Sequence, residues 1–206
     1  MKKLISKIDE LRSSEIKNRV DRRILEFEEV GKNKDLIFSE LCFCILTANS
    51  SADNCIRVQK EAGEHFDSLE GDRLAGKLKE VGCRFHTKRA GYIVEARKNR
   101  NELIEKVGEL ESRELRQWIA DTIKGIGMKE ASHFLRNIGH KNLAIIDFHI
   151  IDILDKEGII KKPKKLDREN YLKIEKELER LGERMNLSLA ELDLYLWYLE
   201  TGKILK

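Results

Sequence analysis

Apolar residues recur three and four positions apart along almost the whole chain, and only one of its 206 residues is a proline, Pro163. Such spacing places the apolar side chains on one face of an α-helix, and helices can continue wherever proline does not interrupt them. Leucine, isoleucine, lysine and glutamate dominate the composition, while aromatic residues make up only 6%. The sequence therefore predicts an all-α fold, a bundle of about eleven to thirteen helices.

The apolar pattern also predicts where the helices lie. They are expected at about residues 4–11, 16–27, 35–47, 56–62, 74–81, 88–99, 101–107, 112–119, 128–138, 148–156, 171–181 and 189–198. Residues 35–47 are apolar on most sides, which is typical of a central, buried helix. A chain of this length can form one core or two small lobes that share a cleft.

The net charge of the chain excludes few possible functions. Forty basic and thirty-seven acidic residues give a net charge of +3, compatible with nucleic-acid binding but well below that of strongly basic domains. Any affinity for nucleic acid must therefore come from where the charges lie. The N-terminus lacks the apolar core of a signal peptide, and no apolar run approaches the ~20 residues of a membrane span. We expect a cytoplasmic protein that does not associate with membranes.

The four cysteines, Cys42, Cys44, Cys55 and Cys83, all lie in the first half of the chain. Their spacing matches neither a zinc finger nor a four-cysteine iron–sulfur loop. Cys42 and Cys44 belong to an apolar run, where buried, reduced thiols are the simpler interpretation. We expect no disulfide, no iron–sulfur cluster and no catalytic metal.

Two glycines one residue apart, Gly125 and Gly127, separate two of the predicted helices. Glycine adopts positive φ without strain, and the bare amides of such a turn beside a helix N-terminus can hold a phosphate without reading the base sequence. Taken alone, the turn is equally compatible with a plain tight connection. The flanking positions are apolar at helical spacing: Leu115, Ile119, Ile123, Ile126, Ala131 and Leu135. This pattern favours a packed helix-hairpin-helix at about residues 115–137.

Lys129 and Asp147 are the candidate reactive residues. Lys129 lies in the first turn after the hairpin, where the helix dipole disfavours a cation and leaves more of the neutral, nucleophilic amine. Such an amine beside a bound sugar can attack C1′ and form a Schiff base. Asp147 stands at a predicted helix start, where it could cap the helix, stabilise positive charge as a glycosidic bond breaks and help to deprotonate Lys129. The alternative for Lys129 is an ordinary surface cation.

The segment from Leu115 to Ile150 resembles the helix-hairpin-helix DNA glycosylase superfamily, whose members carry a glycine hairpin, a catalytic lysine at the position of Lys129 and an aspartate at that of Asp147. More specifically, the chain looks like the compact archaeal-type class of 8-oxoguanine DNA glycosylases/AP lyases. The matching segments are 41–49, 83–85, 88–90, 124–136, 147–150 and 192–206. The resemblance covers essentially the whole chain. It implies one unit, residues 1–206, of two intertwined helical lobes with a DNA- and base-binding cleft between them.

What the resemblance implies is a bifunctional repair enzyme. It would flip 8-oxoguanine out of double-stranded DNA, excise it and nick the strand by β-elimination through a Schiff base on Lys129, with Asp147 as electrostatic partner. Phe85 and Trp197 match the aromatic residues that hold the base, and Lys206 matches a residue implicated in recognising the lesion. The enzyme is expected to act as a monomer on duplex DNA, associated with the nucleoid if the source is a prokaryote. No cofactor is expected beyond a structural monovalent cation at the hairpin when DNA is bound.

Three further residues are candidates for the same site. Relatives place a polar residue at Asn49 to fill the gap left by the flipped base, although an asparagine there could equally cap a helix. His133 lies four residues after Lys129 on the same helix face and could line the cleft, or could simply be packed. Asp193 could accept a hydrogen bond from a base edge. Phe148 departs from the family, whose members commonly have a small or basic residue there.

Two other functions remain compatible with parts of the sequence. The first is a helix-hairpin-helix glycosylase for another damaged base, such as a monofunctional enzyme for alkylated bases; Lys129 argues against it, because monofunctional members generally lack that amine. The second is a non-enzymatic DNA-binding module. A module would explain the two glycines but leaves Asp147, Phe85, Trp197 and the C-terminal tail unexplained.

Overall fold

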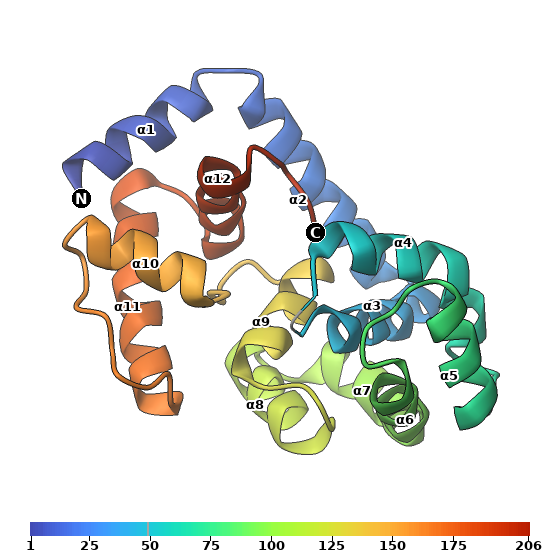
Figure 1. Cartoon of the computed structure of the whole chain (residues 1–206). Coiled ribbons are helices and arrows are strands. Elements are labelled where there is room, and N and C mark those ends of the chain that lie inside the picture. Colours follow the sequence, from blue (N-terminus) through green and yellow to red (C-terminus); the bar gives the residue numbers. More distant parts are fainter. Residues whose placement is uncertain (49) are drawn as a thin grey trace.

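The computed structural model describes residues 1–48 and 50–206, and this part of the chain consists of helices and connecting loops without any strand (Figure 1). The predicted all-α fold is confirmed. The α-helices are α1 (Lys2–Arg12), α2 (Ile16–Lys32), α3 (Lys34–Thr47), α4 (Ala52–Ala62), α5 (Gly71–Glu80), α6 (His86–Ala96), α7 (Arg100–Glu109), α8 (Ser112–Thr122), α9 (Met128–Asn137), α10 (Phe148–Lys156), α11 (Arg168–Met185) and α12 (Leu189–Thr201). Two short 3₁₀ helices, η1 (Gly63–His65) and η2 (Arg97–Asn99), follow α4 and α6.

Polar caps explain where several helices begin. The side chain of Asn33 accepts the Asp35 N–H at the start of α3, and Ser188 forms a capping box with Glu191 at the start of α12. α11 is longer at both ends than the apolar pattern predicted. It begins after a capping aspartate, Asp167, and its polar first turn carries no apolar signal.

The helices enclose two hydrophobic cores. One lies among α3 to α9, and the other lies among α1, α2, α10, α11 and α12. The chain therefore starts in the second lobe, builds the first and returns to the second, and α2 runs from one lobe to the other (Figure 1). Phe27 of α2 packs in the second core, whereas Val30, one turn later, packs against the first.

α3 is the central helix of the first lobe, as predicted. Its buried residues extend from Ile37 to Thr47 with Ser39 as the one partly exposed position. Cys42 and Cys44 lie in this helix, and all four cysteines are buried and free. Burial raises the pKa of the Cys42 and Cys44 thiols well above the ordinary value, which keeps them protonated at neutral pH.

α8, the glycine turn and α9 form the predicted helix-hairpin-helix. Gly125 has a φ of +88°, and a Cβ at this position would overlap the ring of Tyr92 on α6. Both observations require glycine here. Gly127 differs from the expectation of two positive-φ glycines, because its backbone is extended, with φ −105° and ψ −170°. Other residues can adopt that conformation, so only Gly125 makes the turn.

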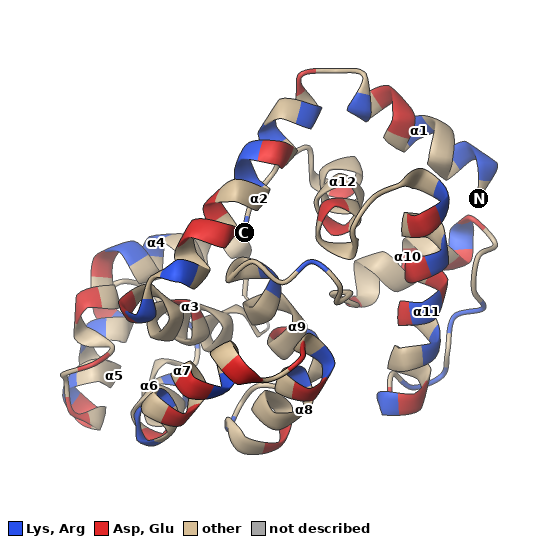
Figure 2. Ribbon diagram, turned by 180° about the vertical axis from the view of Figure 1, so that it is seen from behind, with Lys and Arg blue, Asp and Glu red and all other residues tan. Residues whose placement is uncertain are grey.

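Basic and acidic residues intermix over the outer helices (Figure 2). Many form exposed ion pairs three or four positions apart, such as Lys17 with Asp21 and Lys173 with Glu169. Such pairs contribute little individually to stability. Every helix in the described part of the chain is too short or too polar to cross a bilayer.

Candidate active site

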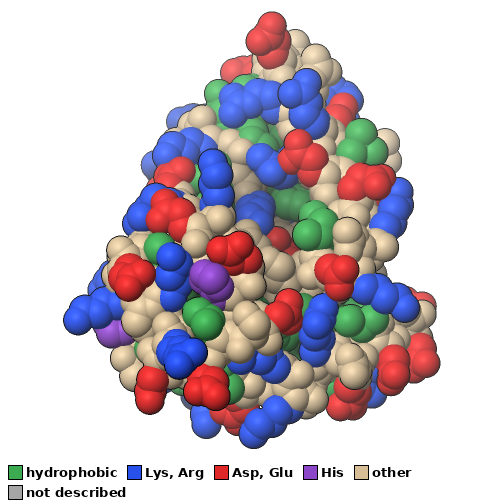
Figure 3. All heavy atoms as spheres, turned by 90° about the vertical axis from the view of Figure 1, so that its right-hand side faces the viewer, with side chains coloured by type: hydrophobic (Ala, Val, Ile, Leu, Met, Phe, Trp, Pro, Cys, Tyr) green, Lys and Arg blue, Asp and Glu red, His purple; other side chains and the backbone are tan. Residues whose placement is uncertain are grey.

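A pocket of about 410 Å³ lies where the two lobes meet. Its walls come from the end of α3 and the start of α4, from α9, from the segment that leads into α10, from α12 and from the last residues of the chain. Figure 3 shows a face of the molecule that is hollowed, with hydrophobic side chains at the floor and Lys and Arg side chains among those at the rim. Apolar walls with a few polar groups are typical of a ligand site.

Lys129 is the second residue of α9 and lines this pocket. The hairpin sets its place, because α9 starts directly after Gly127. Its side chain is 29% exposed, and Nζ lies 3.5 Å from Oε1 of Glu130, which also lines the pocket. The lysine is therefore neither fully buried nor an ordinary surface cation. No motif or spacing in the sequence indicates that Glu130 belongs to the site.

Asp147 is the N-cap of α10 and lines the same pocket. Its Oδ1 accepts a hydrogen bond of 3.0 Å from the Ile150 N–H, so the predicted capping role is confirmed. Capping engages one oxygen, and a carboxylate has further lone pairs on the other. The residue can therefore cap the helix and act on a bound group at the same time.

Asp193 is held by a cation, Arg136, that was not among the residues predicted from the sequence. It lies on α12, largely buried, and forms an ion pair with Nη1 of Arg136 on α9. Burial raises the pKa of this carboxyl, and the guanidinium of Arg136 acts in the opposite direction. Arg136 is itself fixed, because its guanidinium also donates to the Asn137 side chain and lies over the ring of Phe27.

His133 both lines the pocket and is packed, so both interpretations of this residue hold. Its ring meets Phe43 edge to face with centroids 5.8 Å apart. Burial lowers the pKa of His133 well below its ordinary value, and the nearby cations, Arg136 foremost, lower it further. The imidazole is therefore neutral at physiological pH.

Lys206 lines the pocket, and side chains of the first lobe bind its ammonium group. Nζ donates to Oε2 of Glu40 at 2.8 Å and to Oε1 of Gln59, and it lies 4.3 Å from the ring centroid of Phe43. Glu40 and Gln59 were not among the residues predicted from the sequence. A signal for Glu40 was present, because an acidic residue inside the apolar stretch of α3 needs a buried partner.

The two predicted base-holding aromatics lie in different surroundings. Trp197 lines the pocket and meets the ring of His149 edge to face at 6.1 Å. Phe85 lies beyond the lining residues, at the N-cap of α6, and is 54% exposed. It has a φ of +55°, a value that residues with a Cβ rarely adopt. The guanidinium groups of Arg84 and Arg89 lie within 6 Å of its ring.

The structure thus brings together predicted site residues from distant parts of the sequence. Those that line the pocket are Lys129, His133, Asp147, Asp193, Trp197 and Lys206. Gly125 and Gly127 lie at the hairpin, before the helix that carries Lys129. Asn49 lies outside the described residues.

Comparison with protein families gives a match to the family described as 8-oxoguanine DNA glycosylase, over residues 20–187. Two similar proteins are named 8-oxoguanine DNA glycosylase/AP lyase. The one from Methanocaldococcus jannaschii is 50% identical, over 98% of this chain and 99% of the relative. The one from Korarchaeum cryptofilum is 47% identical, over 98% of each chain.

Solved structures agree with these matches. The crystal structure of the M. jannaschii 8-oxoguanine glycosylase/lyase in complex with a 15mer DNA containing 8-oxoguanine superimposes with a TM-score of 0.95, over 98% of this chain and 99% of that one. The 8-oxoguanine DNA glycosylase of Thermotoga maritima, 41% identical, superimposes with a TM-score of 0.94, over 100% and 99%. Likeness at this level extends to the whole two-lobed arrangement.

Proposed function

Because the chain belongs to the 8-oxoguanine DNA glycosylase family, we propose that it excises 8-oxoguanine from duplex DNA and then cleaves the abasic strand, with Lys129 as nucleophile and Asp147 as its electrostatic partner. The relatives named above carry both activities in their names. We further propose that it works as a monomer on the DNA of the cytoplasm, associated with the nucleoid if the source is a prokaryote.

One observation carries the assignment of these two residues. Lys129 and Asp147 belong to different helices, yet they line one pocket between the lobes. An amine and a carboxylate that line one pocket are the two groups that this reaction needs.

The reaction follows from these groups. The Lys129 amine attacks C1′ of the flipped nucleotide, the N-glycosidic bond breaks, and the base leaves with the bonding electrons and takes up a proton. Asp147 stabilises the positive charge that develops on the sugar. The amine and C1′ then form a Schiff base as the sugar ring opens. Loss of a proton from C2′ expels the 3′ phosphate, which nicks the strand by β-elimination.

Binding and recognition are assigned to separate groups. The hairpin of Gly125 and Gly127 would hold a phosphate of the DNA backbone without reading sequence. We also propose a monovalent cation there when DNA is bound. The carbonyl of Ile123 would supply one ligand to such an ion, since among the described contacts it accepts only the Ile126 N–H and keeps a second lone pair. The ion would add positive charge next to the phosphate.

The base itself would lie against a different set of residues. Those proposed to recognise it are Phe85, His133, Asp193, Trp197 and Lys206, and Asn49 is proposed to contact the DNA where the base has left. Trp197 and Phe85 supply ring faces for stacking. Neutral His133 has a ring nitrogen that can accept a hydrogen bond from the base. The ion-paired carboxylate of Asp193 can accept another.

Borohydride trapping tests the function. Incubated with borohydride and a duplex that contains one 8-oxoguanine, the protein should form a covalent adduct, because borohydride reduces a Schiff base to a stable amine. A duplex with guanine at that position should give none, and a panel of duplexes with alkylated or other oxidised bases shows which lesion is preferred. Excision without an adduct would indicate a monofunctional glycosylase. Binding without excision would indicate a DNA-binding module.

Removing Lys206 should separate base recognition from strand cleavage. We expect excision of 8-oxoguanine to fall by about 10- to 100-fold, the value of one hydrogen bond to a charged group, while nicking of a ready-made abasic site changes by less than about threefold. Single-turnover assays on the two substrates measure both. The control is Lys203→Ala, which removes only an exposed ion pair with Asp53 and should leave both rates unchanged. Equal losses on both substrates would mean that Lys206 is only structural.

A further inference from the structure

The segment from Leu143 to Ile146 leads into Asp147 and is buried between the lobes without helical structure. Leu143 belongs to the first core, whereas Ala144 and Ile146 belong to the second. The main-chain N–H and C=O groups of a buried, non-helical segment cannot pair with one another as they do in a helix. They need other partners, because a polar group left unpaired away from water is costly.

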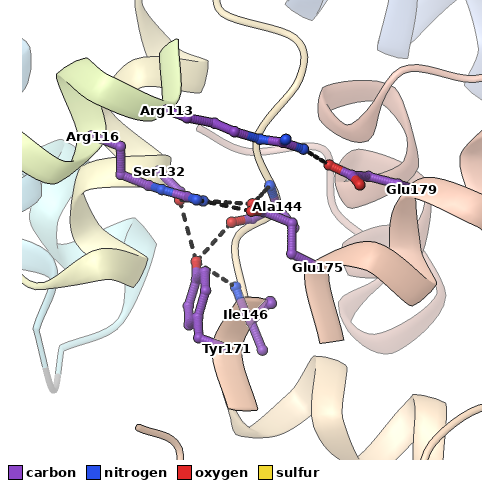
Figure 4. Close-up of polar contacts among 8 residues, drawn as sticks. All are labelled: Arg113, Arg116, Ser132, Ala144, Ile146, Tyr171, Glu175 and Glu179. Carbon is purple, nitrogen blue, oxygen red and sulfur yellow. Dashed lines mark hydrogen bonds and ion pairs between the residues drawn. The ribbon is translucent and has the colours of Figure 1, made fainter. Parts of the chain in front are cut away.

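Two side chains on one face of α11 supply those partners (Figure 4). Oε1 of Glu175 accepts the Ala144 N–H at 3.0 Å. The hydroxyl of Tyr171 donates to the Ala144 carbonyl at 2.7 Å and accepts the Ile146 N–H at 3.3 Å. Three main-chain groups directly before Asp147 are therefore fixed by residues four positions apart on one helix.

The Tyr171 hydroxyl has its full set of partners. Its one proton goes to Ala144, so it accepts from Ile146 and from the hydroxyl of Ser132, whose Oγ lies 3.2 Å away. Burial raises the pKa of Tyr171 far above its ordinary value, so the phenol keeps that proton at any physiological pH.

The same contacts continue into the first lobe. Arg116 of α8 forms a bidentate ion pair with Glu175, and both side chains are only 2% exposed. Arg116 also donates to Oγ of Ser132 at 3.2 Å and lies over the ring of Tyr171, 5.7 Å from its centroid. The network thus joins α8 and α9 of one lobe to α11 of the other. A bidentate pair of this kind fixes geometry as well as charge.

The network touches the site at two places. Ser132 lies on α9 one turn after Lys129, and Ile146 is the residue before Asp147. We infer that Tyr171, held by Ser132 and Arg116, is a positioning residue that keeps the carboxylate of Asp147 in place relative to the amine of Lys129. This inference rests on the roles proposed above for Lys129 and Asp147. Under this inference α11 contributes to the reaction by positioning Asp147, although its side chains take no part in the chemistry.

The substitution Tyr171→Phe tests this role. It keeps the ring and its packing and removes only the hydroxyl, so the Ala144 carbonyl and the Ile146 N–H lose their partner while the bond from the Ala144 N–H to Glu175 remains. Because a displacement of about 1 Å can cost about 100-fold in rate, we expect the single-turnover rate of 8-oxoguanine excision to fall by about 10- to 100-fold. The dissociation constant for duplex DNA should change by less than about threefold. An unchanged rate in the folded variant would overturn the inference.

A matched control lies on the same two helices. Arg113 of α8 forms an exposed ion pair with Glu179 of α11, three and four residues from the members of the buried pair (Figure 4). Arg113→Gln loosens the contact between α8 and α11 without touching the segment before Asp147. It should leave the excision rate unchanged. A loss equal to that of Tyr171→Phe would mean that any weakening between these helices slows the enzyme, and would also overturn the inference.

A double-mutant cycle with Asp147→Asn separates positioning from general destabilisation. If Tyr171 acts through the Asp147 carboxylate, Tyr171→Phe should cost less than about threefold once that carboxylate is gone. If the rate losses of the two single substitutions multiply in the double mutant, the inference is contradicted. Should Asp147→Asn alone have no effect, the proposed role of Asp147 would fail instead. Ser132→Ala is a smaller change in the same network and gives a second cycle in case Tyr171→Phe does not fold. We expect this substitution to lower the excision rate three- to tenfold in the wild-type background and to have no effect in the Asp147→Asn background. A loss that persists in that background would contradict the inference.

Discussion

Replacing Lys129 by glutamine will abolish the covalent adduct with DNA that contains 8-oxoguanine under borohydride, and will lower base excision by at least about 10³-fold. Glutamine keeps most of the side-chain length but has no amine that could attack C1′ and form a Schiff base. Gel mobility of the trapped complex and single-turnover excision measure the two effects. Binding to duplex DNA should be nearly unchanged, because the side chain is one of many basic groups on the protein.

The control for Lys129→Gln is Lys173→Gln. Lys173 is an exposed lysine on α11 that pairs with Glu169 four residues earlier, and its loss removes one positive charge outside the pocket lining. Trapping by this variant should equal that of the wild type. Trapping at full yield by Lys129→Gln would identify another amine as the nucleophile, and peptide mapping of the adduct would then locate it.

Replacing Asp147 by asparagine is expected to slow excision by about 10²- to 10³-fold without lowering the melting temperature. Asparagine caps helices as well as aspartate does, so the bond to the Ile150 N–H survives while the negative charge is lost. Asp147→Ala removes the cap as well and should additionally cost about 1 kcal/mol in the free energy of unfolding. Thermal melts and single-turnover rates on the same samples separate the two roles.

The chain contains a matched control for this substitution. Asp167 caps α11 with the same geometry, its Oδ1 accepting the Asn170 N–H at 3.0 Å. Asp167→Asn makes the same chemical change at a helix N-terminus outside the pocket lining and should leave excision unchanged. If it slowed the reaction as much as Asp147→Asn, the effect would reflect altered helix ends and not the carboxylate in the pocket.

Features that depend on residues close in sequence were predictable. The helices follow from apolar spacing, and α3 was recognisable as buried because its apolar residues occupy all sides. The position of Lys129 followed from the glycine turn, which starts α9 at a defined residue. Asp147 could be placed at a helix start because aspartate after an apolar stretch is a common cap.

Features that join distant residues were not predictable from one sequence. The partners of Lys206 and Asp193 are Glu40 and Arg136, more than fifty positions away in each case, and nothing local marks them as pairs. Nor does the sequence tell which glycine of the hairpin turns the backbone. That was decided by the ring of Tyr92, which packs closely on Gly125 from another helix.

α6 connects the surroundings of Phe85 with the glycine hairpin. Phe85 stands at its N-terminus, and Tyr92, seven residues on, packs against Gly125 of the hairpin. At 1.5 Å per residue these positions are about 10 Å apart along the helix axis. α6 is therefore a rigid spacer of set length between the aromatic predicted to stack on the base and the turn proposed to hold a phosphate. Substitutions on its exposed side leave that length intact, whereas one inserted residue between Phe85 and Tyr92 would turn the two contacts about 100° out of phase.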